Sequence, residues 1–208
     1  EPTLVGIEYY KRLIELQKEF CNEFWNHENP YTGLKNCDDP VFAMVEIVNE
    51  SGLFIDYMDQ FPAFLTPEHK ADFVEKFDKW LKENGYDKKA EEFDLYEHEN
   101  ETLIEFKIYL QEKYFAQMRD YMREIGVKIP IPGTNWTITP ANIKTLCDMD
   151  YYDSHAYYYD WNWKEFEKKC MNKAITQSEK SFLNVCSFAS SKDKPTFISE
   201  WDMPWPNE

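Results

Sequence analysis

Apolar side chains recur along the chain with the spacing of helices in some regions and of strands in others. Between residues 3 and 26 they return at helical spacing with charged residues between them, which predicts an amphipathic helix. A second helix is expected to begin at Thr66-Pro67, where an N-cap residue precedes a proline at the first helical position, and to end near Gly85. A third helical pattern runs from about 101 to 125.

Short, largely apolar runs alternate with these helical segments and predict β-strands. Further helices are expected around 143–146 and across 163–189. Strands that alternate with helices imply parallel βαβ units. The expected strands are 41–48, 128–131, 149–155 and 194–199.

Polar or aromatic residues follow each expected strand at its C-terminal end. Active sites of (β/α)8 barrels lie at this end of the strands. Four strand ends of this kind in series therefore favour a (β/α)8 (TIM) barrel as the fold. The residues concerned are Asn49 and Glu50, Asn135 and Trp136, His155 and Tyr157, and Glu200 and Trp201.

The net charge of −16 narrows the range of partners. Clustered Lys and Arg side chains hold a phosphate backbone, and this chain has 39 acidic against 23 basic residues with no such cluster. We therefore expect neither nucleic acid nor an anionic membrane surface as a partner, and a neutral, hydroxyl-rich substrate fits the charge. Phe, Trp and Tyr make up 17% of the residues, which leaves aromatic faces for stacking on sugars, bases or peptides.

Five scattered cysteines are interpreted as small buried hydrophobes, and their spacing assigns no disulfide. The sequence has no metal-ligand spacing, no Gly-rich phosphate loop and no Ser or Cys nucleophile motif, so we expect neither a metal nor a cofactor. It also has no run of about 18 apolar residues that would predict a membrane span. No signal peptide is visible at the N-terminus.

Glu50 and Glu200 each end an apolar run, which is an unusual place for a carboxylate without a task. Either residue alone would be interpreted as a solvated loop residue. At the same end of two parallel strands, they fit the paired carboxylates of a retaining glycosidase, which stand about 5–5.5 Å apart. One of the pair protonates the leaving oxygen and later activates water, while the other attacks the anomeric carbon.

Several motifs resemble those of clan A glycoside hydrolases, such as family 5 cellulases and mannanases. The segment 45–51 (VEIVNES) resembles their Asn-Glu motif on the fourth strand, and 198–201 (ISEW) resembles their nucleophile segment on the seventh. The segment 155–157 (HAY) is similar to their sixth-strand His-x-Tyr. The segments 29–33 (NPYTG) and 201–208 are similar to parts of large bacterial members of the cellulase-like group.

The resemblance implies cleavage of a β-linked poly- or oligosaccharide by double displacement, with retention of configuration. Glu50 would be the acid/base and Glu200 the nucleophile. Asn49 would bind the sugar 2-hydroxyl, and Tyr157 would hydrogen-bond Glu200 and hold it ionised. His155 would line the cleft.

Three further residues complete the substrate-binding set that we expect. Asn135 and Trp136 follow the second expected strand, and Trp201 follows the fourth. The two tryptophans are candidate platforms on which pyranose rings stack. For each of them, packing at the rim of the barrel is an equally good interpretation.

The resemblance also predicts how much of the barrel is present. The chain would begin in the helix before the fourth strand and end just past the seventh, so residues 1–208 would form one partial catalytic domain. A full barrel takes about 250 residues, and the missing barrel half would be needed to close the fold. Residues 53–100 carry little of the resemblance and are expected to be a helical insertion or flap.

Two alternatives remain open. The first is a non-catalytic carbohydrate-binding relative, against which the presence of both Glu50 and Glu200 argues. The second is an inactive, aggregation-prone fragment, because an open half-barrel exposes unpaired strand edges. An exported enzyme, secreted or periplasmic, is favoured over a cytoplasmic one.

Overall fold

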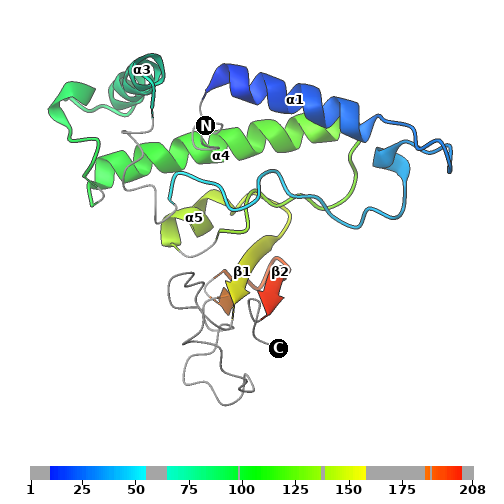
Figure 1. Ribbon diagram of the computed structural model, residues 1–208. Helices are drawn as coiled ribbons and strands as arrows, with labels where there is room; N and C mark the ends of the chain where they lie inside the picture. The colour runs from blue at the N-terminus through cyan, green and yellow to red at the C-terminus, as the bar shows by residue number, and fades with distance from the viewer. Residues whose placement is uncertain are drawn as a thin grey trace, which may run out of the picture.

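The computed structural model describes residues 10–54, 65–97, 99–136, 139–157, 186–187 and 189–202. In Figure 1, the long helix α4 runs between α1 above it and α5 with the strand pair β1–β2 below it. The elements in chain order are α1 (Lys11–Trp25), η1 (Asn36–Asp38), α3 (Pro67–Glu83), η3 (Ala90–Glu92), α4 (Glu101–Glu124), α5 (Pro140–Thr145), β1 (Tyr152–Tyr157) and β2 (Thr196–Asp202).

The helices form where the apolar periodicity and the caps predict them. The Thr66 hydroxyl accepts a hydrogen bond from the His69 amide at the start of α3, and Gly85 follows the helix with a φ of 79°. The N-cap of α4 is Asn100, and Gly126 follows that helix with a φ of 103°. Glycine adopts these left-handed conformations without a steric penalty, so both helices end at the predicted positions.

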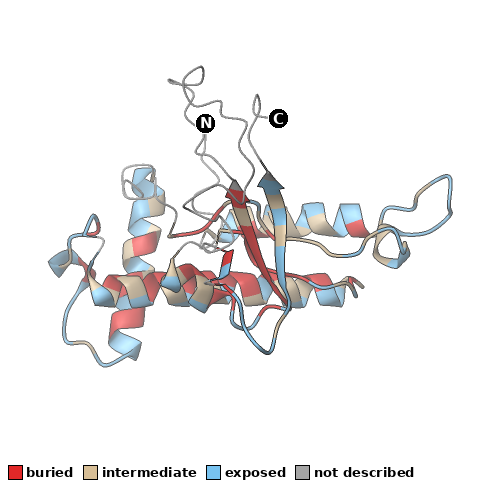
Figure 2. Ribbon diagram, turned by 90° about the horizontal axis from the view of Figure 1, so that it is seen from below, coloured by how far each residue is buried: buried red, intermediate tan, exposed pale blue. Residues whose placement is uncertain are grey.

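Two apolar clusters join the helices around α4. In the first, α3 packs on the N-terminal half of α4, and the rings of Phe77 and Phe106 stack with centroids 4.7 Å apart. The second joins α1 to the C-terminal half of α4 and to β1, and it includes Ile14, Met118 and Tyr152. Figure 2 shows buried residues along α4 and β1, whereas β2 is mostly exposed.

The strands differ from the expected fold. Among the described residues only β1 and β2 are strands, and they form a two-stranded parallel sheet. The expected strands at 41–48 and 128–131 are not present as strands. The expectation of a (β/α)8 barrel portion with strands four to seven is therefore wrong. The missing barrel half depended on that fold and has no support in this architecture.

Prolines explain why the second expected strand does not form. Pro130 and Pro132 have no amide hydrogen, and a strand with alternate donors missing cannot build a regular ladder. The segments 41–48 and 128–135 therefore touch at isolated points. The amides of Val45 and Val48 donate to the carbonyls of Pro130 and Gly133 at 3.1 and 3.2 Å, and Val48 forms a single parallel bridge with Thr134.

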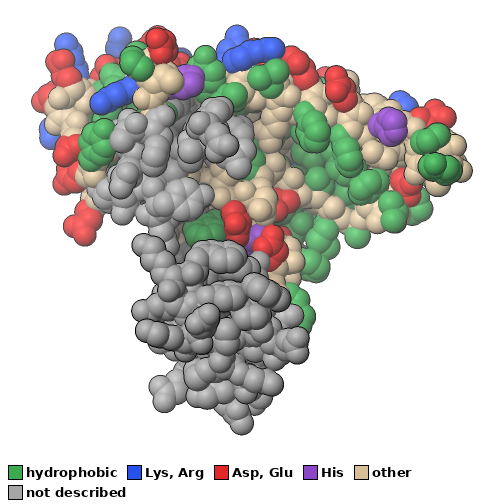
Figure 3. Space-filling model, in the orientation of Figure 1, with side chains coloured by type: hydrophobic (Ala, Val, Ile, Leu, Met, Phe, Trp, Pro, Cys, Tyr) green, Lys and Arg blue, Asp and Glu red, His purple; other side chains and the backbone are tan. Residues whose placement is uncertain are grey.

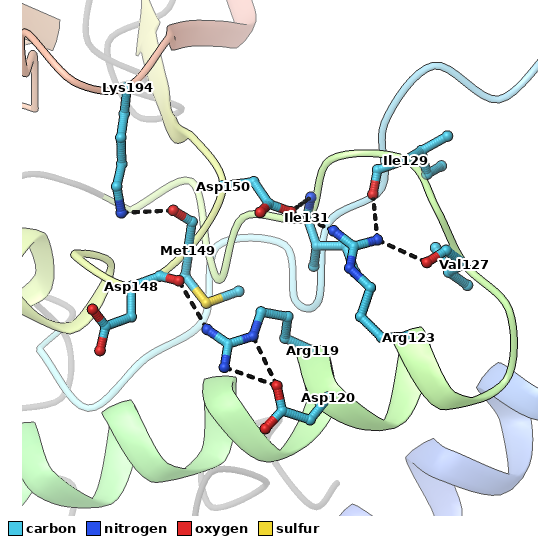
Figure 4. A network of polar contacts seen from close by, with 10 residues as sticks. All are labelled: Arg119, Asp120, Arg123, Val127, Ile129, Ile131, Asp148, Met149, Asp150 and Lys194. Atoms are coloured by element: carbon cyan, nitrogen blue, oxygen red, sulfur yellow. Dashed lines mark hydrogen bonds and ion pairs between the residues drawn. The ribbon is translucent and has the colours of Figure 1, made fainter.

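Basic side chains donate hydrogen bonds to the backbone of the segment after α4 and of the segment just before β1 (Figure 4). Arg123 Nη1 donates to the carbonyl oxygens of Val127 and Ile129 at 2.7 and 2.8 Å. Its Nη2 contacts Asp150 Oδ2 at 2.6 Å, and the same oxygen accepts from the Ile131 amide at 2.7 Å. The end of α4 is thus tied to two segments that lead toward the candidate site.

Two more cations complete this arrangement, which we call the basic clamp (Arg119, Arg123, Asp150 and Lys194). Arg119 Nη1 donates to the Asp148 carbonyl at 2.8 Å. Lys194 Nζ, which lies two residues before β2, donates to the Cys147 carbonyl and to the Met149 carbonyl at 2.7 Å. The clamp therefore sets the starting positions of both strands relative to α4.

Part of the expected secondary structure falls outside the described residues. Most of the expected helix 163–189 and the first residues of the expected helix 3–26 are in this group. No helix in the described ranges combines the length and the apolar character needed to cross a bilayer.

Candidate active site

The first candidate carboxylate stands on a tight turn after the segment 41–48. Glu50 has a φ of 45° and is the non-glycine residue with a positive φ among those described. This backbone conformation costs a residue with a Cβ about 1 kcal/mol or more, so its surroundings must hold it. The Glu50 amide donates to Asn135 Oδ1 at 2.8 Å, which ties the turn to the loop after residue 131.

The second carboxylate is brought into place by an irregularity in the strand pair. Ser154 pairs with Ile198, but the next residue, His155, pairs with Glu200. Ser199 is thus an extra residue on β2, which is the arrangement of a β-bulge. Bulges redirect side chains near functional sites, and this one sets Glu200 opposite His155.

His155 contacts both candidate carboxylates through one ring nitrogen. Its Nδ1 lies 2.8 Å from Glu50 Oε1 and 3.4 Å from Glu200 Oε2. The His155 side chain is only 3% exposed, whereas both glutamates are about two-fifths exposed. Figure 3 shows acidic side chains on either side of a histidine just below the helical part of the molecule. The two carboxylates are thus open to solvent above a buried imidazole.

The contacts of His155 indicate which nitrogen carries its proton. A carboxyl oxygen without a hydrogen accepts hydrogen bonds, so a hydrogen on Nδ1 satisfies the contacts with both glutamates. The other nitrogen, Nε2, lies 3.0 Å from Ser199 Oγ, a hydroxyl that can either donate or accept. The surroundings of His155 therefore favour the tautomer with its hydrogen on Nδ1.

A buried amide connects the turn to the interior. The Asn135 side chain is 1% exposed, and all its polar groups are used. Its Nδ2 donates to Glu46 Oε2 at 2.8 Å and to Asn49 Oδ1 at 2.7 Å, while its Oδ1 accepts from the Glu50 amide. Its main-chain carbonyl accepts from the His155 amide at 3.3 Å. Asn135 thus holds both Glu50 and His155.

Two further acidic side chains lie behind the exposed pair. Asp153 is buried, and its Oδ1 accepts from the amides of Ser154 and Ser199 at 2.8 and 3.0 Å. Glu46 is half-buried, and its Oε1 is fully buried. Burial and the negative charge of Asp153, with smaller contributions from Glu200 and Glu50, raise the pKa of Glu46 to about 8. Glu46 therefore holds its proton at neutral pH.

The same groups have the composition of a cation site. One ligand atom from each of Glu50, His155 and Glu200 lies within 4.8 Å of the other two. A divalent ion that accepts nitrogen and oxygen ligands could replace the Nδ1 proton of His155 between the two carboxylates. The arrangement thus has two chemical uses, paired-carboxylate catalysis and metal binding.

The structure brings five of the residues predicted for the site into one hydrogen-bonded group: Asn49, Glu50, Asn135, His155 and Glu200. The tryptophans are outside that group. Trp136 packs against the apolar cluster between α3 and α4. Its buried Nε1 has no hydrogen-bond partner among the described residues. Trp201 is 56% exposed on β2. The Tyr157 side chain, predicted to contact Glu200, lies outside what the structure describes.

Three residues that contribute to the site were not predicted to do so: Glu46, Asp153 and Ser199. Glu46 could have been found, because a carboxylate inside the apolar run 41–48 is itself a signal of a special role. Asp153 carries no such signal, because the segment 149–155 also contains Asp150, Ser154 and His155. The role of Ser199 depends on the bulge, for which the sequence carries no signal.

No protein-family model matches the chain, and comparisons with curated proteins and with solved structures find no similar protein.

Proposed function

We propose that the protein is a retaining glycoside hydrolase in which Glu200 is the nucleophile and Glu50 the acid/base. The observation that carries this proposal is the separation of the two side chains, which have one carboxylate oxygen each within 4.8 Å of the other. Retaining enzymes hold their carboxyl groups about 5–5.5 Å apart, whereas inverting enzymes leave about 6.5–9.5 Å for a water molecule. The spacing favours direct attack on the sugar by a carboxylate.

The reaction would proceed in two displacements. Glu200 attacks the anomeric carbon as the bond to the leaving oxygen breaks, and Glu50 gives its proton to that oxygen. Glu50 then takes a proton from water, whose oxygen attacks the anomeric carbon and breaks the ester bond to Glu200. Each carboxylate returns to its starting protonation state, and the configuration is retained.

His155 would hold the two carboxyl groups in a fixed position relative to each other through both steps. A hydrogen bond from Nδ1 to Glu50 and a longer contact to Glu200 restrict the rotamers of both side chains. This preorganisation lowers the cost of aligning them with the substrate. Because its ring is buried, His155 itself is a positioning residue in this proposal.

A neutral sugar chain suits the surroundings of the pair. Several acidic side chains gather there, so an anionic substrate would be repelled. Asn49 is exposed and accepts from Asn135 through Oδ1, so its amide nitrogen is the group that would donate to a sugar hydroxyl. Exposed Trp201 offers a flat face for a pyranose ring.

A mechanism-based inhibitor tests the nucleophile directly. The protein is incubated with aryl 2-deoxy-2-fluoro-β-glycosides of common sugars, and intact mass followed by peptide mapping locates any adduct. We expect one glycosyl ester, on Glu200, and none in Glu200→Gln. The control variant Glu23→Gln, an exposed acid on α1, should label like the wild type. An ester on any other carboxylate would contradict the assignment.

Rescue by azide separates the two roles. Glu200→Ala should lower kcat by more than about 10³-fold. With azide it should then yield a glycosyl azide of inverted configuration, whereas Glu50→Ala should yield the retained one. EDTA should leave the wild-type rate unchanged, because no step requires a metal. If EDTA abolishes turnover and added metal restores it, the cluster acts as a metal site and the proposal is wrong.

A further inference from the structure

Glu46 lowers the stability of the fold. Its side chain lies in a segment whose neighbours are apolar, and its Oε1 is buried without a hydrogen-bond partner among the described residues. A buried polar atom left in this state costs about 1–3 kcal/mol. A leucine of similar size would avoid that cost, so the carboxyl group must provide something that packing does not.

What Glu46 provides is an acceptor for Asn135. The Asn135 amide has two chemically different ends, and only one orientation suits its neighbours. Nδ2 faces two acceptors, Glu46 Oε2 and Asn49 Oδ1, and Oδ1 faces the Glu50 amide. If the amide were flipped, its NH₂ group would meet the Glu50 N–H, and two donors would oppose each other. Glu46 therefore helps to set which end of Asn135 faces Glu50.

The orientation of Asn135 matters because Glu50 is strained. Its φ of 45° is one that a residue with a Cβ adopts at a cost, and its N–H needs a partner to keep that conformation. Asn135 Oδ1 supplies this partner at 2.8 Å. From this backbone the Glu50 side chain reaches His155, with Oε1 2.8 Å from Nδ1. Removing the acceptor at Glu46 would thus disturb the Asn135 side chain and, through it, the backbone of Glu50.

We propose that Glu46 is a positioning residue for the glycosidase reaction, a buried carboxyl group that fixes the Asn135 amide and, through it, the backbone and aim of Glu50. This inference rests on the proposed function of Glu50 as the acid/base. Glu46 itself touches no reacting atom in it.

The protonated state of Glu46 suits this task. A neutral carboxyl group still accepts from Asn135 through its carbonyl oxygen. An ionised one would place a negative charge in a partly buried position beside Asp153, Glu200 and Glu50, and burial together with these acids is what raises the pKa of Glu46. A glutamine at the same position keeps a neutral acceptor of the same shape, whereas a leucine keeps the volume and removes the acceptor.

Two substitutions separate this role from simple packing. We expect Glu46→Leu to lower kcat about 10- to 100-fold with little change in KM, because a misplaced acid costs rate without weakening substrate binding. Glu46→Gln should keep kcat within about threefold of the wild type, because its amide oxygen can still accept from Asn135 and hold Glu50 in position. Glu23→Gln is again the control for removing one acid. A folded Glu46→Leu with wild-type kcat, or a Glu46→Gln as slow as Glu46→Leu, overturns the proposal.

A double-mutant cycle tests the route through Asn135. If Glu46 acts on Glu50 only through this amide, Glu46→Leu should cost no further rate once Asn135→Ala has been made. Fully additive losses would show that Glu46 acts by another path and would overturn the inference. The cycle still works if Glu46→Leu folds poorly, because Glu46→Ala can replace it.

The backbone amide resonance of Glu50 gives a measurement that needs no activity. It should shift in Glu46→Leu and stay near the wild-type position in Glu46→Gln. If Glu50→Gln and Glu200→Ala both keep full turnover, the proposed function fails, and this resonance alone decides the positioning role. If those variants are inactive but the resonance is identical in all Glu46 variants, the function stands and the positioning role is refuted.

Discussion

The two ends of the β1–β2 pair carry side chains of opposite charge, and these side chains have different roles. Just before the strands begin, the basic clamp donates to main-chain carbonyls and to Asp150. A few residues further along, His155 meets Glu50 and Glu200, with Asp153 and Glu46 behind them. Both ends are polar and hydrogen-bonded, but each cation of the first end donates to oxygen acceptors, whereas the second end places four acidic side chains near one another.

This difference separates stability from function. Each cation of the clamp donates to main-chain carbonyl oxygens of segments distant in the chain, and these hydrogen bonds stabilise the fold. In the site, burial and the neighbouring acidic side chains raise the pKa of Glu46, and the backbone at Glu50 is strained. Proteins keep such unfavourable arrangements where they are needed for chemistry. We therefore expect substitutions at the site to affect rate and substitutions in the clamp to affect stability.

The largest effect is expected from Glu50→Gln. Without a proton donor, the rate should fall about 10²- to 10⁴-fold for substrates with poor leaving groups. The free energy of unfolding, measured by urea denaturation, should change little, because the amide keeps the size of the side chain and its oxygen can still accept from His155 Nδ1. A variant that loses stability in proportion to activity would show that the site does not differ from the clamp in this way.

The next effect concerns the pH dependence of stability. The pKa of Glu46 is about 8 in the folded chain and near 4.5 for an ordinary glutamate. Between these values the folded state binds more protons than the unfolded state, so this group makes stability fall as pH rises from about 4.5 to about 8. Above that range its contribution is constant.

Glu46→Gln removes this titration and makes the difference measurable. Relative to the wild type, the variant should gain on the order of 3 kcal/mol of unfolding free energy between pH 5 and pH 9. Urea denaturation at pH 5, 7 and 9 measures the difference, with Glu23→Gln as the control. Parallel curves for wild type and Glu46→Gln would mean that Glu46 is ionised in the folded state.

A substitution in the clamp should lower stability and leave the rate nearly unchanged, the opposite of a substitution in the site. Arg123→Ala removes two hydrogen bonds to carbonyls and the contact with Asp150, and it should lower the unfolding free energy by about 2 kcal/mol. Arg123→Lys should recover part of this loss, because an ammonium keeps the charge but not the fork geometry. For the folded fraction, kcat should stay within about threefold of wild type, since Arg123 is remote from the reacting atoms.

Asp150→Asn should have the smallest effect. The amide oxygen can still accept from the Ile131 amide, so only the charge of the pair with Arg123 is lost. Both partners are more than a third exposed, and solvent screens the pair, so we expect a loss of less than about 1 kcal/mol. Thermal unfolding in low and high salt checks this, because the difference from the wild type should shrink as salt rises.

Local patterns predicted the α-helices of the described residues and two of the four expected strands. The cap at Thr66 and the glycines after α3 and α4 are local signals, and they stand where the helices begin and end. The strands near 152 and 196 were also anticipated. The run 128–131 is not a strand, because Pro130 and the adjacent Pro132 remove donors that a ladder needs. The run 41–48 is not a strand either, so the barrel inferred from four strands is wrong.

For the candidate site, the sequence by itself determined which carboxylates end apolar runs, and Glu50, Glu200 and His155 do converge. Only the tertiary structure decided how they meet. The bulge at Ser199 sets the register of Glu200 against His155, and the orientation of one buried amide, Asn135, holds the turn of Glu50. Residue type and order are local properties, whereas register and amide orientation depend on partners distant in the chain, which exist only once the chain has folded.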